Sequence, residues 1–202
     1  LHDYYSLITG MDRDIGRLLD ALDAQQLTTN TIVVFTSDQG IALGSHGLMG
    51  KQNLYEDTQR VPMLIAGPGI PHGSSDAMVY LHDLFPTLCE LSGLPLPEKI
   101  DGRSFAAQVT GKAAGRDALM MAYTNTQRSV RDARWKLICY PQIHRKALFD
   151  LSVDPFETKD LAGDPANAGQ IARMVKLLER EQAAAGDRLP LEAKVAKPEI
   201  FN

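Results

Sequence analysis

The feature that most constrains the fold is an apolar segment that runs directly into a short polar one. Residues 31–36 (TIVVFT) are mostly β-branched or aromatic and do not alternate with polar residues, which is typical of a strand buried on both faces of a parallel sheet. Ser37, Asp38, Gln39 and Gly40 follow at once. These side chains should therefore lie at the carboxyl end of a strand, which is where open α/β sheets bind ligands.

The neighbouring segments fit an α/β arrangement. Apolar residues from Tyr4 to Leu22 recur at steps of three and four, which predicts an amphipathic helix that ends near Gln26. Asp83 and Gly93 have the residue types expected at the start and the end of a further helix. The remaining expectations here are a glycine-rich loop over 40–60, a buried strand over 61–66 and a short helix over 104–109.

Beyond about residue 112 the pattern changes to short strands separated by turns, which predicts an antiparallel sheet. A last amphipathic helix should follow Asp164 and Pro165 and extend to about Ala185. We therefore predict an α/β part over 1–112 and a small α+β subdomain with a C-terminal helix and tail over 113–202. The expected strands are 118–124, 127–132, 134–140 and 146–151.

Composition removes several classes of function. Of the 202 residues, 44% are hydrophobic and 23% are charged, so the chain is an ordinary globular one. The net charge is −4 and no basic stripe stands out, which argues against nucleic acid as a partner. Apolar runs such as 32–35 are too short to span a bilayer, so no membrane partner is expected. Cys89 and Cys139 lie in no CxxC motif and are interpreted as small buried hydrophobes.

The densest group of chemically useful side chains begins at Asp38. A carboxylate beside the Gln39 amide suits a hard cation such as Ca²⁺. His46 and Lys51 lie in the loop that follows, and positive groups near a metal form a site for a tetrahedral oxyanion. The alternative is a local turn at Asp38 with a solvated, flexible loop, because SDQG alone is a weak signal.

Taken together, the motifs resemble the sulfatases of the alkaline-phosphatase-like superfamily. SDQG, GSHGLMGK and LYED carry the resemblance first, and further stretches match the family in the same order over nearly the whole chain. These further stretches are DRDIGRLLDAL, RVPMLIAGPGI, HDLFPTLCELSGLPLP, IDGRSF, SVRDARWKLI and LFDLSVDPFETKDLA.

The resemblance implies a fold and a set of roles. The fold would be part of a parallel-rich α/β sheet with helices, followed by the small antiparallel subdomain. Asp38 and Gln39 match metal ligands, usually for Ca²⁺, with Mg²⁺ as the other candidate. Lys51 matches the lysine that contacts the sulfate, and His46 either contacts the substrate or orders the loop, so both are candidate catalytic and substrate-binding residues. Glu56 would order the loop.

Two basic residues of the predicted antiparallel sheet are not assigned to the site. Arg131 and Lys136 lie in the SVRDARWKLI stretch, and both are interpreted as surface or packing residues. Histidines outside the loop lack supporting neighbours, and His82 is interpreted as a residue at a helix start.

The sequence also departs from the family pattern. No cysteine or serine lies in Cys/Ser-x-Pro-x-Arg, the motif that yields the formylglycine nucleophile, and the family's paired aspartates are absent. The resemblance thus implies the C-terminal part of a sulfatase, with formylglycine in an N-terminal part that is missing here. We expect the isolated chain to be inactive. If the chain is truncated, exposed sheet edges and apolar faces would favour a dimer.

The resemblance leaves alternatives open. A sulfated carbohydrate or other sulfated small molecule is the expected substrate, and a periplasmic or secreted location is favoured. A phosphomonoester, phosphodiester or phosphonate hydrolase of the same superfamily would share the metal pair and the lysine loop. The third alternative is a catalytically dead binding or structural domain.

Overall fold

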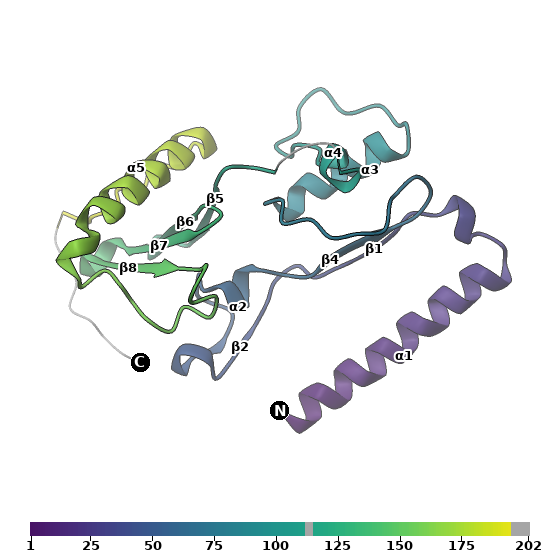
Figure 1. Ribbon diagram of the computed structural model, residues 1–202, viewed down its shortest axis with the longest axis horizontal. Helices are drawn as coiled ribbons and strands as arrows, with labels where there is room; N and C mark the ends of the chain where they lie inside the picture. Colours follow the sequence, from purple (N-terminus) through teal and green to yellow (C-terminus); the bar gives the residue numbers. More distant parts are fainter. Residues whose placement is uncertain (112–114, 195–202) are drawn as a thin grey trace.

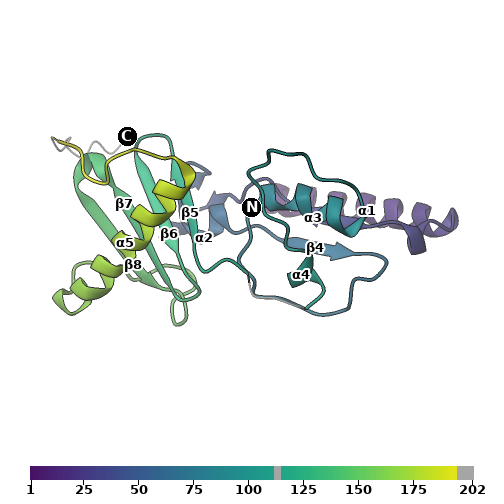
Figure 2. The same ribbon diagram turned by 90° about the horizontal axis from the view of Figure 1, so that it is seen from above.

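The computed structural model describes residues 1–111 and 115–194. Figures 1 and 2 show two groups of elements side by side, with the helices α1, α3 and α4 in one and the strands β5 to β8 under α5 in the other. The boundary predicted at 112/113 lies outside the described residues, as does the tail from 195, and the division into two parts stays a prediction.

The first helix, α1 (His2–Ala24), forms as the apolar period predicts. None of its residues is buried, and Figure 1 shows it standing away from the other elements. Among the described helices, none is both long and apolar enough to cross a membrane.

The strands β1 (Val33–Thr36) and β4 (Met63–Ala66) form where they were predicted, but they pair with each other antiparallel. Val33 lies opposite Ala66, and Thr36 lies opposite Met63. β1 was expected to lie in a parallel sheet and to be buried on both faces, but its described partner is antiparallel and its residues are only half-buried. The segment between them returns to the end of β1 that it left, so β4 must run in the opposite direction. β4 was predicted to be a buried strand as well, but its residues alternate between half-buried and exposed, and Leu64 is 60% exposed.

A buried carboxylate joins the start of α3 (Leu84–Leu91) to later parts of the chain. Asp83 accepts hydrogen bonds from the backbone N–H groups of Tyr80 and Arg103, and it pairs with Arg116 at 2.6 Å. Burial alone would raise the pKa of Asp83, but Arg116 and these N–H groups hold that pKa below its usual value. The short helix α4 (Ala106–Val109) follows, and the HDLFPT and IDGRSF motifs are thus structural here.

A meander of antiparallel strands fills the second group of elements, as predicted. β5 (Leu119–Tyr123), β6 (Gln127–Arg131), β7 (Trp135–Tyr140) and β8 (Arg145–Asp150) pair in sequence order. The helix α5 (Ala168–Ala185) covers one face of this sheet. Their shared core consists of Ala118, Val130, Leu137, Cys139, Leu148, Met174 and Leu178.

Both cysteines are buried and unpaired, as expected. Burial raises the pKa of the Cys139 thiol to about 12, so this side chain behaves as a hydrophobe at neutral pH.

The opposite face of the sheet carries the segment that follows Lys51. Successive residues of a strand point to opposite faces, so Leu137 faces α5 whereas Lys136 and Ile138 face away from it. Leu54 is only 1% exposed and packs there against Ile138 and Phe149. The candidate site's loop is thus built directly on the C-terminal sheet.

Candidate functional site

The polar segment after β1 is held against the loop that follows Lys51. The backbone N–H of Gly40 donates to the carbonyl oxygen of Thr58 at 3.0 Å. A Cβ atom at Gly40 would lie 2.1 Å from the carbonyl oxygen of Asp57, so a side chain cannot be placed there without moving backbone. Glycine is therefore required for the end of β1 to approach this loop so closely.

The structure brings two of the predicted site residues together. The Gln39 side-chain nitrogen donates to the Lys51 carbonyl oxygen at 2.8 Å, and this bond fixes the orientation of the Gln39 amide. The Asp38 and Lys51 side chains are exposed, and Lys51 makes no ion pair with any described residue. Asp38 has only a long contact, 3.5 Å from the Ser37 hydroxyl.

The donor chemistry at this point fits a hard cation. The Asp38 carboxylate is exposed, and the Gln39 amide oxygen accepts no hydrogen bond from the described residues while the amide nitrogen is held. Carboxylate and amide oxygens are ligands that Ca²⁺ prefers, but it takes about six to eight of them. Asp38 and Gln39 can therefore supply only part of a calcium site.

The glycine-rich loop is an ordered hairpin. β2 (Ala42–Leu43) and β3 (Met49–Gly50) pair antiparallel, and a short 3-10 turn (Ser45–Gly47) closes the tip. His46 has a φ of 55° and Gly44 a φ of 111°, so the tip uses left-handed backbone that glycine adopts readily. The loop therefore has regular local structure, although residues 44–49 are exposed to solvent as the alternative predicted.

His46 lies at the hairpin tip with its ring stacked on Tyr55. The ring centroids are 3.7 Å apart and the planes differ by 7°. Tyr55 in turn makes an edge contact with Phe149 of β8. The structure therefore anchors the tip through His46. Contact between His46 and substrate stays a prediction.

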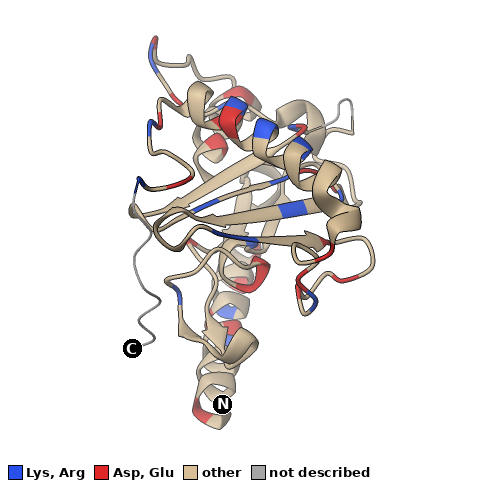
Figure 3. Ribbon diagram, turned by 90° about the vertical axis from the view of Figure 1, so that its left-hand side faces the viewer, with Lys and Arg blue, Asp and Glu red and all other residues tan. Residues whose placement is uncertain are grey.

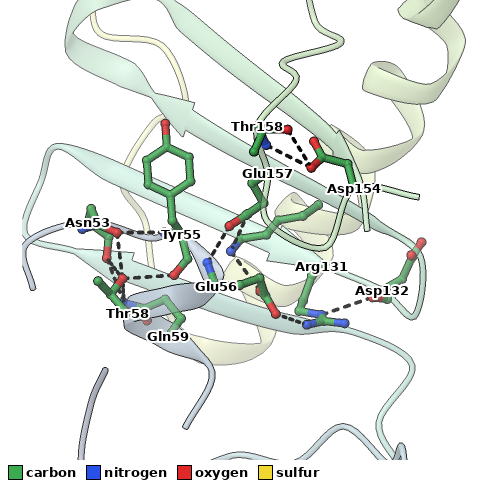
Figure 4. Close-up of polar contacts among 11 residues, drawn as sticks. Asn53, Tyr55, Glu56, Thr58, Gln59, Arg131, Asp132, Asp154, Glu157 and Thr158 are labelled. Carbon is green, nitrogen blue, oxygen red and sulfur yellow. Dashed lines mark hydrogen bonds and ion pairs between the residues drawn. The ribbon is translucent and has the colours of Figure 1, made fainter. Parts of the chain in front are cut away.

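Beyond Lys51 the chain makes a tight, internally bonded turn (Figure 4). The Asn53 side-chain oxygen accepts from the Tyr55 N–H at 3.0 Å and from the Thr58 hydroxyl at 2.7 Å. Gln59 donates to the Asn53 carbonyl oxygen at 2.8 Å. These bonds close the one-turn helix α2 (Glu56–Gln59) against the residues just after Lys51.

A buried charge cluster joins this turn to the C-terminal sheet (Figure 4). The Lys136 ammonium lies 2.9 Å from a carboxylate oxygen of Glu56 and 2.9 Å from one of Glu157. The other Glu157 oxygen accepts from the Glu56 backbone N–H at 2.6 Å. Arg131 pairs with the second oxygen of Glu56. We call Glu56, Arg131, Lys136 and Glu157 the buried charge cluster.

Sequence reasoning missed most of this cluster. Glu56 orders the loop as expected. Arg131 and Lys136 were interpreted as surface or packing residues, but Lys136 is fully buried and both are ion-paired with Glu56, a role in holding the loop that was not predicted. Figure 3 shows basic residues within the strands of the sheet. The period-two pattern of WKLICY, with Leu137 facing the α5 core, could have placed Lys136 on the other covered face.

Burial changes the pKa of one carboxylate in the cluster. Burial raises the pKa of Glu157, and Lys136 opposes that rise only in part. Glu157 also has a φ of 55°, an uncommon conformation for a residue with a side chain. Glu157 belongs to the DPFETKDL motif, and its carboxylate reaches the loop by accepting the Glu56 N–H.

Comparison with known proteins identifies the family. The family described as N-sulphoglucosamine sulphohydrolase, C-terminal, matches residues 44–184, which is more than half of the chain. The chain belongs to the sulfatase family. It is 34% identical to choline-sulfatase of Rhizobium meliloti over 169 residues, covering 80% of this chain and 33% of that protein. It is 32% identical to N-acetylglucosamine-6-O-sulfatase of Bacteroides thetaiotaomicron, covering 95% of this chain and 37% of that protein. The sulfatase chain thus spans about a third of the length of these relatives.

Solved structures confirm the alkaline-phosphatase-like fold of this sulfatase chain. The structure of BT4656 in complex with its substrate, D-glucosamine-2-N,6-O-disulfate, superposes with a TM-score of 0.80 at 28% identity. The match covers 93% of this chain and 41% of that one. A phosphonate monoester hydrolase from Silicibacter pomeroyi superposes with a TM-score of 0.77 at 27% identity, covering 88% and 40%. The roles of Asp38, Gln39, His46 and Lys51 stay predictions.

Proposed function

We propose that this chain is part of a sulfuric ester hydrolase that acts on a sulfated carbohydrate, and that it supplies half of the metal and sulfate site. The observation that carries the proposal is the 2.8 Å hydrogen bond from Gln39 to the Lys51 carbonyl. It joins the proposed metal ligands to the proposed sulfate-contacting lysine. Membership of the sulfatase family supplies the reaction class.

Each residue then has a distinct task. Lys51 is exposed, and its ammonium would pair with the sulfate oxygens and stabilise the negative charge of the transition state. Asp38 and Gln39 would hold Ca²⁺, or Mg²⁺, which when bound polarises a sulfate oxygen. His46 keeps one ring face on Tyr55 and would offer a ring nitrogen to the substrate. None of the 202 residues lies in the motif that yields formylglycine. The family's formylglycine would therefore come from another part of the protein.

The proposed substrate class is a sulfated sugar. One relative is named an N-acetylglucosamine-6-O-sulfatase, and BT4656 was solved with a disulfated glucosamine as its substrate. His46 at the tip of the hairpin and Lys51 just after its second strand are both exposed, and they supply polar groups of the kind that bind sulfate and sugar hydroxyls.

A second candidate function is hydrolysis of phosphonate or phosphate esters, favoured by the superposition on the phosphonate monoester hydrolase. The test produces the protein from its complete open reading frame, whatever its length. It compares kcat/KM for aryl sulfate, aryl phosphate and phosphonate monoester substrates. We expect the sulfate ester to be preferred. A preference for phosphonate would support the second candidate, and no turnover of any ester would leave a binding or structural domain.

A further inference from the structure

The buried charge cluster lies between the proposed site and the C-terminal sheet. We propose that Glu157 and Lys136 are positioning residues, which set the place of Lys51 and Gln39 through the loop at 51–58. This inference rests on the proposed function for the roles of Lys51 and Gln39. Neither positioning residue would touch the substrate.

The Glu157 carboxylate contacts both a backbone N–H group and a buried cation. One carboxylate oxygen accepts the Glu56 N–H at 2.6 Å, and the other faces the Lys136 ammonium at 2.9 Å. Asp154 accepts from the backbone N–H groups of Thr158 and Lys159, which bonds the turn that carries Glu157. One oxygen is thus held by a hydrogen bond and the other by an ion pair without a hydrogen bond from the described residues, although Glu157 lies 101 residues from Glu56.

The contacts continue without a gap from this carboxylate to the site. Glu56 opens α2, whose residue Thr58 accepts from the Gly40 N–H at 3.0 Å. Gly40 is adjacent to Gln39, which donates to the Lys51 carbonyl at 2.8 Å. Leu54 is buried against the face of the C-terminal sheet and anchors the middle of residues 51–58. Movement of Glu56 would therefore shift Lys51 directly along the chain, and it would shift Gln39 through the bond from Gly40 to Thr58.

Charge balance gives the cluster one preferred arrangement. Two carboxylates face two cations, and the Lys136 side chain is fully buried while that of Glu157 is 1% exposed. A buried network that is fully paired is rigid, whereas one left with an unpaired charge must rearrange or admit water. Changing one acid to an amide should consequently loosen the loop rather than merely weaken a surface contact.

Kinetics of the enzyme produced from the complete open reading frame test the proposal first. Glu157→Gln should lower kcat/KM for a sulfate ester about 10- to 100-fold, the size of loss that a small displacement of a catalytic group causes. In a Lys51→Ala background the same change should cost clearly less, because one of the two groups that Glu157 positions is gone while Gln39 remains. The matched control is Asp187→Asn, which breaks the 2.6 Å pair with Arg128 elsewhere on the sheet. It should change kcat/KM by less than about 2-fold.

Amide hydrogen exchange on the same proteins provides a readout that needs no activity. Glu157→Gln should speed exchange at residues 51–58 more than in the sheet, and Asp187→Asn should not. An equal kinetic penalty with and without Lys51, or exchange that rises uniformly, would overturn the proposal. If the unmodified enzyme hydrolyses no sulfate ester, the proposed function fails, and the exchange pattern alone then decides whether Glu157 positions the loop.

Discussion

Replacing Lys136 by methionine removes the central cation of the buried charge cluster while keeping most of the side-chain volume. Lys136 is fully buried and serves both Glu56 and Glu157, whereas Arg131 pairs only with Glu56. In Lys136→Met, Glu157 is left buried without a cation. Breaking a buried pair by removing one partner costs about 3–5 kcal/mol. A typical domain has about 5–15 kcal/mol of stability, so the variant should be close to unfolding.

The loss should depend on pH in a definite direction. Burial already raises the pKa of Glu157, and removing Lys136 takes away the charge that opposes the rise. The folded variant then binds a proton at Glu157 more tightly than the unfolded chain does. Its destabilisation is therefore largest at neutral pH, and it shrinks as the pH falls towards about 4.3, the ordinary glutamate value.

Urea unfolding at pH 7 and pH 5 measures both effects. Trp135 is the single tryptophan and lies next to Lys136, so its fluorescence reports on this strand directly. The double variant Lys136→Met/Glu157→Gln should recover part of the loss, because it removes the stranded charge. A loss below about 1 kcal/mol at pH 7, or one that is equal at both pH values, would refute the reasoning from buried charge.

Three further outcomes follow from the structure. Gly40→Ala should lower the free energy of unfolding by about 1–3 kcal/mol, because the new Cβ would lie 2.1 Å from the Asp57 carbonyl oxygen. Gly10→Ala has open space around it and should be neutral or stabilising, and thermal unfolding of both variants compares the two. Asp187→Asn should lower the free energy of unfolding by about 1–2 kcal/mol at pH 7, because pairing with Arg128 lowers the pKa of Asp187 to about 2. This difference from the unmodified protein should vanish as the pH falls from about 4 to 2, which unfolding measured at several acidic pH values would show. The 202-residue chain alone should not turn over a chromogenic sulfate ester; turnover that Lys51→Ala abolishes would contradict this.

Local patterns predicted most of the elements correctly. The four strands from β5 to β8 and the helices α1, α3 and α5 follow from periodicity and from residues such as Asp83 and Gly93, because their contacts are close in sequence. The antiparallel pairing of β1 with β4 did not follow, since an apolar strand carries no signal for the direction of its neighbour.

For the candidate site, the sequence likewise predicted which residues matter but not the contacts between them. Motifs brought Asp38, Gln39, His46 and Lys51 to attention, but not the bond between Gln39 and Lys51 or the stacking of His46 on Tyr55. Lys136 meets Glu56 from 80 residues away, and nothing local to either residue predicts that meeting. Long-range ion pairs depend on the register of the sheet, which becomes known only with the structure.

Release of sulfate from 6-O-sulfated N-acetylglucosamine tests the central proposal most directly. The enzyme from the complete open reading frame is compared with Lys51→Ala and with Lys176→Ala, an exposed lysine on α5 that serves as the control. We expect Lys51→Ala to lower kcat/KM about 100-fold or more, as loss of a group that stabilises transition-state charge does, and Lys176→Ala to have no effect. Sulfate release that stays within about 2-fold of the unmodified enzyme in Lys51→Ala would contradict the account.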